Sequence, residues 1–325
     1  MPIRFTSPSL GGHRQVVLGA SEWELGLSYR RLTADDWFVE DEIRPEASPG
    51  GQPNRFNINT VDLSLGYGVS DRLSLRLTVP FTTATNSRIH PDGLRHETSA
   101  TGVGDINLIG SYWVLDPRVP RGGNVAVGLG LKAPTGSHEI EDEFGLPASG
   151  GTIQFPVHPG LQPGGGGWGI LLEAQAYQRL AGALSGYLFG SYQLSPRATT
   201  DVLFSPPAPA SVLSVTDVYH ARAGFAYPLV PQAGLSVSLG SRIDGIPVRD
   251  LIGGDEGFRA PGYTIFLDPG MAITRGRGTL TASVPVRLRG TFKQNLNDQA
   301  GGPPPPGDRG DLASYLIFLG YAYRL

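Results

Sequence analysis

The chain has 325 residues and a formal net charge of −3, from 26 lysine and arginine and 29 aspartate and glutamate residues. This near-neutral balance gives no basic footprint for phosphate, so no nucleic-acid partner is expected, and the absence of cysteine excludes disulfides, thiolate metal sites and cysteine nucleophiles. Charged residues make up 17% of the chain and glycine contributes 46 residues, a composition that favours a β-rich fold.

From residue 22 onward, apolar and polar side chains alternate, which is typical of strands that have one apolar face. The alternating rows fall at 23–30, 61–69, 73–81, 106–114, 125–131, 168–176, 184–192, 219–227, 235–243, 263–273, 280–288 and 315–325. We therefore expect about twelve strands of about 9–11 residues, the length of a tilted membrane strand. The phase of 184–192 is ambiguous, because Leu188 competes with Tyr187 and Phe189. Phe56 and Ile58 are out of phase with residues 61–69, which predicts a bulge near Asn59.

The connections between these rows alternate strictly in length. Short connections are expected at 70–72, 116–122, 180–183, 228–232 and 275–278, and long ones at 33–54, 82–100, 134–166, 195–213, 244–262 and 291–311. An up-and-down barrel with one rim of short turns and one rim of long loops gives this order.

Aromatic side chains lie at the two ends of the apolar rows, with mostly aliphatic residues between them. Such girdles suit the headgroup level on both sides of a membrane, because aromatic rings with a polar edge prefer that level. The residues expected in the girdles are Trp23, Tyr29, Tyr67, Phe81, Tyr112, Trp168, Tyr263, Tyr315 and Tyr323.

These patterns predict an all-β fold, a transmembrane up-and-down antiparallel β-barrel of about twelve strands in a bacterial outer membrane, in contact with its lipid. Residues 22–325 would form this single domain, and residues 1–21 a periplasmic or lumen segment. No apolar run long enough for a membrane helix and no signal peptide is visible. The sequence leaves two alternatives here: a leader was removed, or the protein stays in the cytoplasm.

If the apolar rows face lipid, the polar rows face the lumen. The residues expected to line it or form its constriction are Asp105, Lys132, Glu173, Arg222, Arg242, Asp268 and Arg287. Because buried charges need a partner, we expect Asp105 to pair with Lys132 and Arg242 with Asp268. Phe189, Phe266, Leu316, Phe318 and Trp113 are candidates for an apolar part of the interior.

No catalytic, cofactor or metal site is predicted. The six histidines form no recognised zinc spacing, and the run from His138 to Glu143 is more simply a solvated acidic loop than a cation site. Some outer-membrane barrels are phospholipases with a His-x-Ser-Asn-Gly signature, but neither His96 nor His220 is followed by those residues, so an enzyme is not expected.

Several segments resemble a known family. Thr101-Gly-Val-Gly-Asp105 followed by Tyr112, the hairpin at 67–73 with Val79-Pro80-Phe81, and the stretch 130–136 resemble outer-membrane barrels of the MetA-pathway, phenol-degradation or "transporter" type. The end of the chain, 321–325, resembles the C-terminal strand of such barrels, with Leu325 where phenylalanine is usual. The resemblance implies uptake of small hydrophobic or aromatic compounds.

The sequence supports a narrow channel for passive uptake of a small solute as the first interpretation. A structural or surface-interaction barrel with a plugged lumen, whose long extracellular loops bind a protein partner, is the alternative. A soluble all-β binding protein is the third.

Overall fold

The computed structural model describes residues 17–119, 122–147, 150–204, 211–301 and 307–325. Within them the chain forms a closed antiparallel barrel that crosses from rim to rim twelve times, as the sequence predicts. Ten crossings are single strands, listed here with their bounds: β1 (Trp23–Val39), β3 (Arg55–Gly68), β4 (Leu73–Ile89), β7 (Gly123–Ala133), β10 (Gly169–Ala181), β11 (Leu184–Leu194), β14 (Val218–Val230), β15 (Leu235–Ile246), β16 (Gly262–Arg275) and β19 (Arg309–Arg324). No helix among the described residues is long and apolar enough to cross a membrane.

Two crossings are interrupted, and proline lies at or beside both breaks. One consists of β5 (Arg95–Val103) and β6 (Ile106–Trp113), which pair in turn with the upper and lower parts of β4 around Pro80. The other consists of β17 (Gly278–Ser283) and β18 (Val286–Phe292), separated by Val284 and Pro285. Because proline has no backbone N–H, it cannot donate to a continuous ladder.

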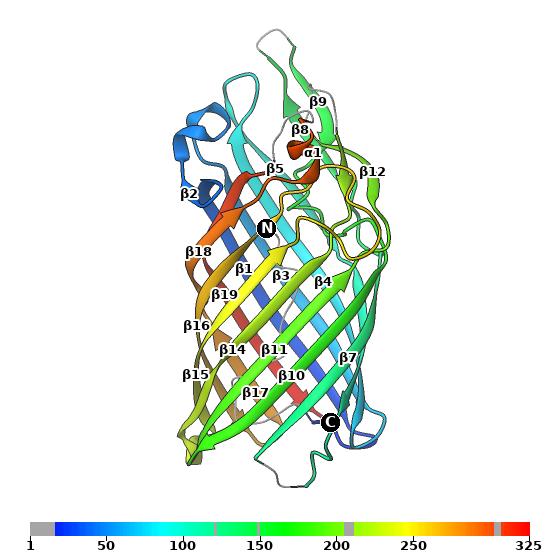
Figure 1. The fold of residues 1–325 in the computed structure, drawn as a ribbon, viewed down its shortest axis with the longest axis vertical. Coiled ribbons are helices and arrows are strands. Elements are labelled where there is room, and N and C mark those ends of the chain that lie inside the picture. The colour runs from blue at the N-terminus through cyan, green and yellow to red at the C-terminus, as the bar shows by residue number, and fades with distance from the viewer. Residues whose placement is uncertain (1–16, 120–121, 148–149, 205–210, 302–306) are drawn as a thin grey trace.

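The first and last strands close the barrel. β1 pairs with β19 from Glu24 opposite Arg324 to Val39 opposite Arg309, and on its other side β1 pairs with β3. Figure 1 shows the tilted strands forming a tall cylinder with the C-terminus at the lower rim.

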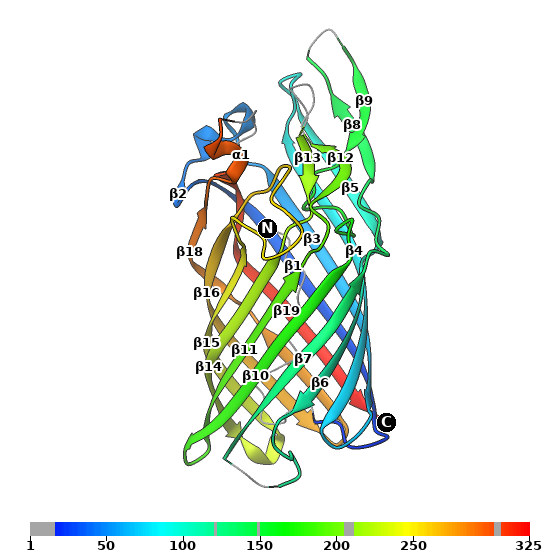
Figure 2. The same cartoon turned by 45° about the vertical axis from the view of Figure 1, so that its right-hand side comes forward.

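The two rims differ as the loop lengths predict. The upper rim carries β2 (Glu42–Ile43), the 3-10 turns Pro45–Ala47 and Pro49–Gly51, β8 (Glu141–Gly145), β9 (Thr152–Pro156), β12 (Thr199–Phe204), β13 (Ser211–Ser214) and α1 (Leu296–Gln299) (Figures 1 and 2). The lower rim has short turns, among them the 3-10 turn Pro231–Ala233. The strands extend further than expected: residues 33–39 belong to β1, and most of 82–100 to β4 and β5.

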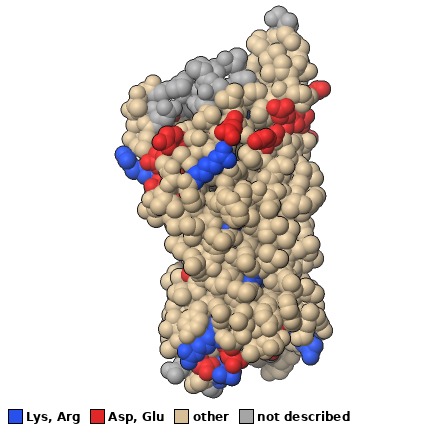
Figure 3. Space-filling view, turned by 90° about the vertical axis from the view of Figure 1, so that its right-hand side faces the viewer, with Lys and Arg blue, Asp and Glu red and all other residues tan. Residues whose placement is uncertain are grey.

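The outer surface has an apolar waist. Leu63, Leu129 and Leu288 are 58%, 64% and 63% exposed, and the charged residues on the face in Figure 3 gather mainly toward the two ends. Exposed leucines in such numbers are unfavourable in water and favourable against hydrocarbon. The nine residues expected in the girdles also lie on the outer side, and the rings of Trp23 and Tyr67 are 4.5 Å apart at the lower rim.

The structure corrects the sequence prediction for β3 and decides which residues of β11 face inward. The predicted bulge near Asn59 is wrong, because β3 pairs with β1 and β4 without a register shift. Phe56 and Ile58 instead point inward with Asp62, into an apolar part of the interior. In β11, Tyr187 and Phe189 are buried and Leu188 is 52% exposed, which settles the ambiguous phase.

Candidate functional site

The inward-facing polar rows are joined by short ion pairs between strands. Arg30 of β1 binds Asp62 of β3 at 2.9 Å, and Arg222 of β14 binds Asp268 of β16 at 2.6 Å. Each pair keeps a buried charge compensated in a region with little water. The strand pleat thus produces a lumen wall that carries charge without leaving it unpaired.

The expected pair of Arg242 with Asp268 is not formed. Arg242 binds Asp244, two residues along its own strand, at 2.7 Å, and Asp268 is taken by Arg222. Asp268 lies opposite Gly240, two residues along β15 from Arg242, and Gly240 has no side chain that would separate Asp268 from β14. Arg242 also lies over the ring of Phe318, 4.6 Å from its centroid.

Asp105 and Lys132 do form the expected pair, and it anchors the third long loop. Lys132 Nζ donates to Asp105 Oδ2 at 2.6 Å and to the carbonyl oxygen of Gly167 at 2.6 Å. Asp105 also accepts hydrogen bonds from the backbone N–H groups of Gly136 and Gly165, at 3.1 and 2.9 Å. The pair therefore binds the segment that leaves β7 and the segment that returns to β10.

Close backbone contact at this anchor requires glycine. A Cβ atom on Gly164 would lie 2.1 Å from the carbonyl oxygen of Gly136, and one on Gly136 would lie 2.8 Å from the Cα atom of Gly164. Real Cβ atoms do not approach that closely, so the two chain segments can meet only because both residues lack a side chain.

The third long loop folds into the upper mouth of the barrel. Leu161 is 0% exposed and packs in an apolar layer with residues from β1, β3, β16 and β19; the members used below are Leu32, Phe56, Leu161, Phe266 and Leu316. The Gln162 side chain holds this segment to the loop, since it accepts from Ile140 N at 3.0 Å and donates to Ile140 O at 2.9 Å.

Two cavities lie along the lumen below this apolar layer. The upper one has a volume of about 70 Å³ and is lined by Asp105, Lys132, Leu32 and Leu316, among others. The lower one, of about 220 Å³, is lined by residues that include Glu173, Arg222 and Arg242. Both cavities share four lining residues, Arg30, Pro80, Asn107 and Phe318, which therefore form the boundary between them.

The seven residues expected in the lumen thus occupy different places. Asp105 and Lys132 line the upper cavity, Glu173, Arg222 and Arg242 line the lower one, and Asp268 is fully buried behind Arg222. Arg287 lies apart from them, in the barrel wall near the upper rim. None of the seven belongs to the shared boundary.

Arg287 closes a seam in the wall. The ladder between β18 and β19 consists of a single pair, Val286 with Tyr315. Above it, Arg287 forms an ion pair with Asp36 of β1, donates to the carbonyl oxygen of Leu312 at 3.0 Å, and lies over the ring of Phe38 at 4.8 Å. Side-chain contacts here replace backbone hydrogen bonds.

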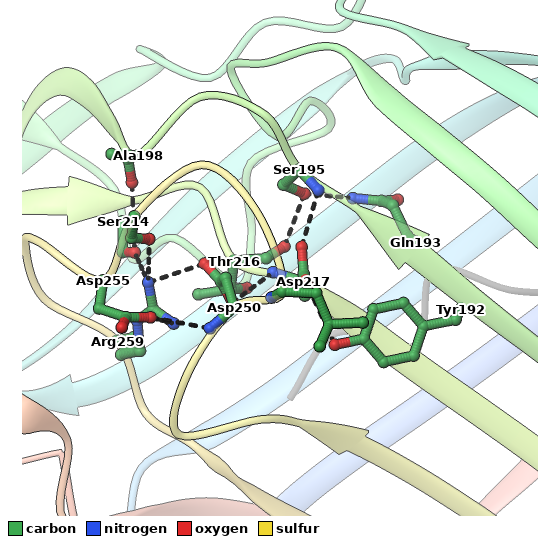
Figure 4. A network of polar contacts seen from close by, with 12 residues as sticks. Tyr192, Gln193, Ser195, Ala198, Ser214, Thr216, Asp217, Asp250, Asp255 and Arg259 are labelled. Carbon is green, nitrogen blue, oxygen red and sulfur yellow. Dashed lines mark hydrogen bonds and ion pairs between the residues drawn. The ribbon is translucent and has the colours of Figure 1, made fainter.

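Arg259 binds loops of the upper rim to one another, and sequence reasoning missed it. Its Nη2 atom donates to Asp250 Oδ2 at 2.8 Å and to Ser214 Oγ at 2.7 Å, and neither charged side chain of the pair is exposed (Figure 4). Burial raises the pKa of Asp250 above the usual carboxyl range, and the Arg259 guanidinium opposes that shift.

A second carboxylate completes this clamp. Asp217 accepts hydrogen bonds from Ser195 N at 2.7 Å, Leu251 N at 2.9 Å and the Tyr192 hydroxyl at 3.0 Å. The loop between β11 and β14 and the loop between β15 and β16 are thereby held together above the barrel (Figure 4). Over the described ranges, no three His, Asp or Glu side chains gather as a metal site would require.

Comparison with known proteins supports the fold. No family model and no curated protein matches the chain. An outer-membrane channel from Pseudomonas putida F1 superposes with a TM-score of 0.66 at 16% identity, over 99% of this chain and 100% of that chain. The beta domain of the Bordetella autotransporter Brka superposes with a TM-score of 0.50 at 10% identity, over 94% of this chain and 100% of that one.

At these identities the likeness shows the fold alone. Together with the apolar waist, the closed barrel and the two unlike rims, it identifies the chain as a bacterial outer-membrane β-barrel.

Proposed function

We propose that this barrel is a narrow channel that admits a small solute passively, and that the solute has an apolar part. The observation that carries the proposal is the lower cavity of about 220 Å³ inside the barrel, whose wall bears paired charges. The apolar layer around Leu161 lies above it and favours a solute that can shed water at the mouth. The Pseudomonas neighbour is an outer-membrane channel, which is in keeping with this proposal.

A blocking substitution tests the proposal with a control on the next residue. Ser64 lines the lower cavity, and Leu65 is 37% exposed on the outer face of the same strand. In planar bilayers and in liposome swelling, Ser64→Trp should reduce conductance and uptake, because the indole fills the lumen. Leu65→Trp should leave both unchanged, because its ring faces lipid.

A plugged structural barrel is the second candidate, and the complete burial of Leu161 in the mouth favours it. Its long loops, held by Arg259 and Asp250, would then present a fixed surface to a protein partner. Absence of conductance and of swelling for the unsubstituted protein, together with a partner that co-purifies through the loops, would select this candidate over the channel.

A further inference from the structure

Three polar side chains lie side by side on three adjacent strands of the barrel wall. Glu173 of β10 lies directly opposite Ser191 of β11, and Ser191 lies directly opposite His220 of β14. Directly opposed side chains in antiparallel strands have Cβ atoms about 4.5–5.5 Å apart. The three residues therefore form one row, and Glu173 brings that row to the lower cavity.

The polar atoms of this row lack partners. The Ser191 hydroxyl and the Nε2 atom of His220 are buried and make no hydrogen bond. Glu173 likewise has no ion pair or hydrogen bond in the described part of the chain. A buried polar group without a partner costs about 1–3 kcal/mol, so the two that Ser191 and His220 place in one row are unfavourable unless they serve a ligand.

Among the carboxyl groups that line the same cavity, Glu173 is the one that forms no ion pair within the described residues. Four arginines line the same cavity, and each has its own carboxylate: Arg30 binds Asp62, Arg76 binds Glu24, Arg222 binds Asp268 and Arg242 binds Asp244. The remaining lining carboxylate is Glu173. An uncompensated carboxylate in a cavity with few waters attracts a cation.

All three groups can accept hydrogen bonds. His220 Nδ1 lies 2.7 Å from Asp244 Oδ1, and an imidazole that donates from Nδ1 presents a lone pair at Nε2 while it is uncharged. A carboxylate and a hydroxyl also accept. The ligand that fits an acceptor row with a carboxyl group that forms no ion pair is a small cation with several N–H donors.

We propose that Glu173 binds the ammonium group of a small amine inside the lumen, and that Ser191 and His220 complete the row of acceptors behind it. This inference rests on the proposed channel and gives its solute a chemical class, an amine with an apolar part. The apolar part passes the layer around Leu161, and the ammonium group then reaches Glu173. The ion pairs of the four arginines keep the remaining wall neutral toward it.

Three probes of equal size test this class: benzylamine, benzyl alcohol and benzoate. Their dissociation constants are measured by calorimetric titration at pH 7 with the full chain in an amphipol. Benzylamine should bind tightest and benzoate weakest. Glu173→Gln should weaken benzylamine about tenfold to a hundredfold, the range of a hydrogen bond to a charged group, and should change benzyl alcohol far less. Ser191→Ala should weaken both by up to about tenfold.

Glu143→Gln is the matched control, because Glu143 is exposed on β8 and carries the same charge outside the lumen. It should bind all three probes as the unsubstituted chain does. Equal affinity for the three probes, or unchanged benzylamine binding in Glu173→Gln, would overturn the proposal. Amine binding without conductance would leave this site standing and refute the channel.

The order Ser191, His220, Asp244 also matches the residue types of an acyl-transfer triad. Ser191 and His220 share no hydrogen bond, and the Ser191 hydroxyl is inaccessible, so the structure favours binding over nucleophilic attack. Intact-mass analysis after treatment with a fluorophosphonate distinguishes the two. An unmodified Ser191 supports the binding site, and a phosphonylated Ser191 overturns it in favour of a nucleophile.

Discussion

Lys132 Nζ lies 2.6 Å from Asp105 Oδ2, and this one ion pair holds both ends of the loop that enters the barrel mouth. Asp105→Asn would remove the carboxylate that binds the buried Lys132 ammonium group. We expect the free energy of unfolding to fall by about 3–5 kcal/mol, the usual loss when one partner of a buried pair is removed. Urea titration of the barrel in lipid vesicles measures it. Glu143→Gln should lose nothing, and a loss of under about 1 kcal/mol in Asp105→Asn would contradict the anchoring role.

Leu161 controls the upper mouth if the barrel conducts. Leu161→Ala removes about 2–5 kcal/mol of packing, so the loop should leave the apolar layer more often and the single-channel conductance should rise. Leu251, which is 70% exposed on another upper loop, provides the control. Its alanine variant should conduct as the unsubstituted protein does. An unchanged conductance in Leu161→Ala would mean that the loop does not limit the pathway.

Arg287 is expected to stabilise the wall rather than to contact solute. Arg287→Met should lower the temperature at which the compact, unheated band is lost on a denaturing gel, because the seam between β18 and β19 has a single ladder pair. Asp36→Asn should act similarly, and the double variant should cost less than the sum of the two by about 0.5–3 kcal/mol. Arg289→Met, which changes an exposed pair, is the control. Additive effects of the two substitutions would refute the role of the Arg287–Asp36 ion pair in closing the seam between β18 and β19.

At the upper rim, the contact between the β4–β5 hairpin and the β8–β9 hairpin should weaken in acid. His90, in the turn that follows β4, accepts a hydrogen bond from Gly145 N at 3.0 Å, and burial lowers its pKa to about 4. A separated hairpin would take up a proton from about pH 6.5 downward, while the docked form resists it until about pH 4. Docking should therefore be unaffected above pH 6.5 and weaken across that window as pH falls.

Hydrogen exchange at the Gly145 amide, corrected for intrinsic rates, follows this contact. Protection should drop between pH 7 and pH 5 in the unsubstituted chain. His90→Phe keeps a ring for stacking on Phe144, which lies 4.4 Å away between centroids, but cannot titrate. Protection in that variant should not depend on pH, and an equal drop in both proteins would exclude His90 as the cause.

The barrel itself could be predicted from the sequence because lipid imposes a strict alternation. Leu63 and Leu65 face out and Asp62 faces in, and no other arrangement of β3 avoids burying a charge against hydrocarbon. The strand extensions at 33–39 and 82–100 were missed because they lie above the apolar waist, where neither face needs to be apolar. The bulge at Asn59 was wrong for a related reason, since Phe56 packs inside the barrel.

The interior could be predicted only in part. Asp105 and Lys132 were paired correctly because their strands are adjacent, but their hydrogen bonds to Gly136, Gly165 and Gly167 depend on a loop path that no local pattern encodes. Which arginine binds Asp268 depends on the register of β15 with its two neighbouring strands, and the sequence pattern does not define that register to the single residue. The Arg259 clamp joins two loops, so its signal is spread over segments that alternation does not describe.

The seal between Trp23–Val39 and Arg309–Arg324 has a consequence for biogenesis. One edge of β1 can pair with β3 early in synthesis, but the other edge finds its neighbour only when β19 has been made. Until then that edge exposes unpaired backbone N–H and C=O groups, to which another chain can add. A variant that lacks β19 would keep this open edge and would be prone to aggregate.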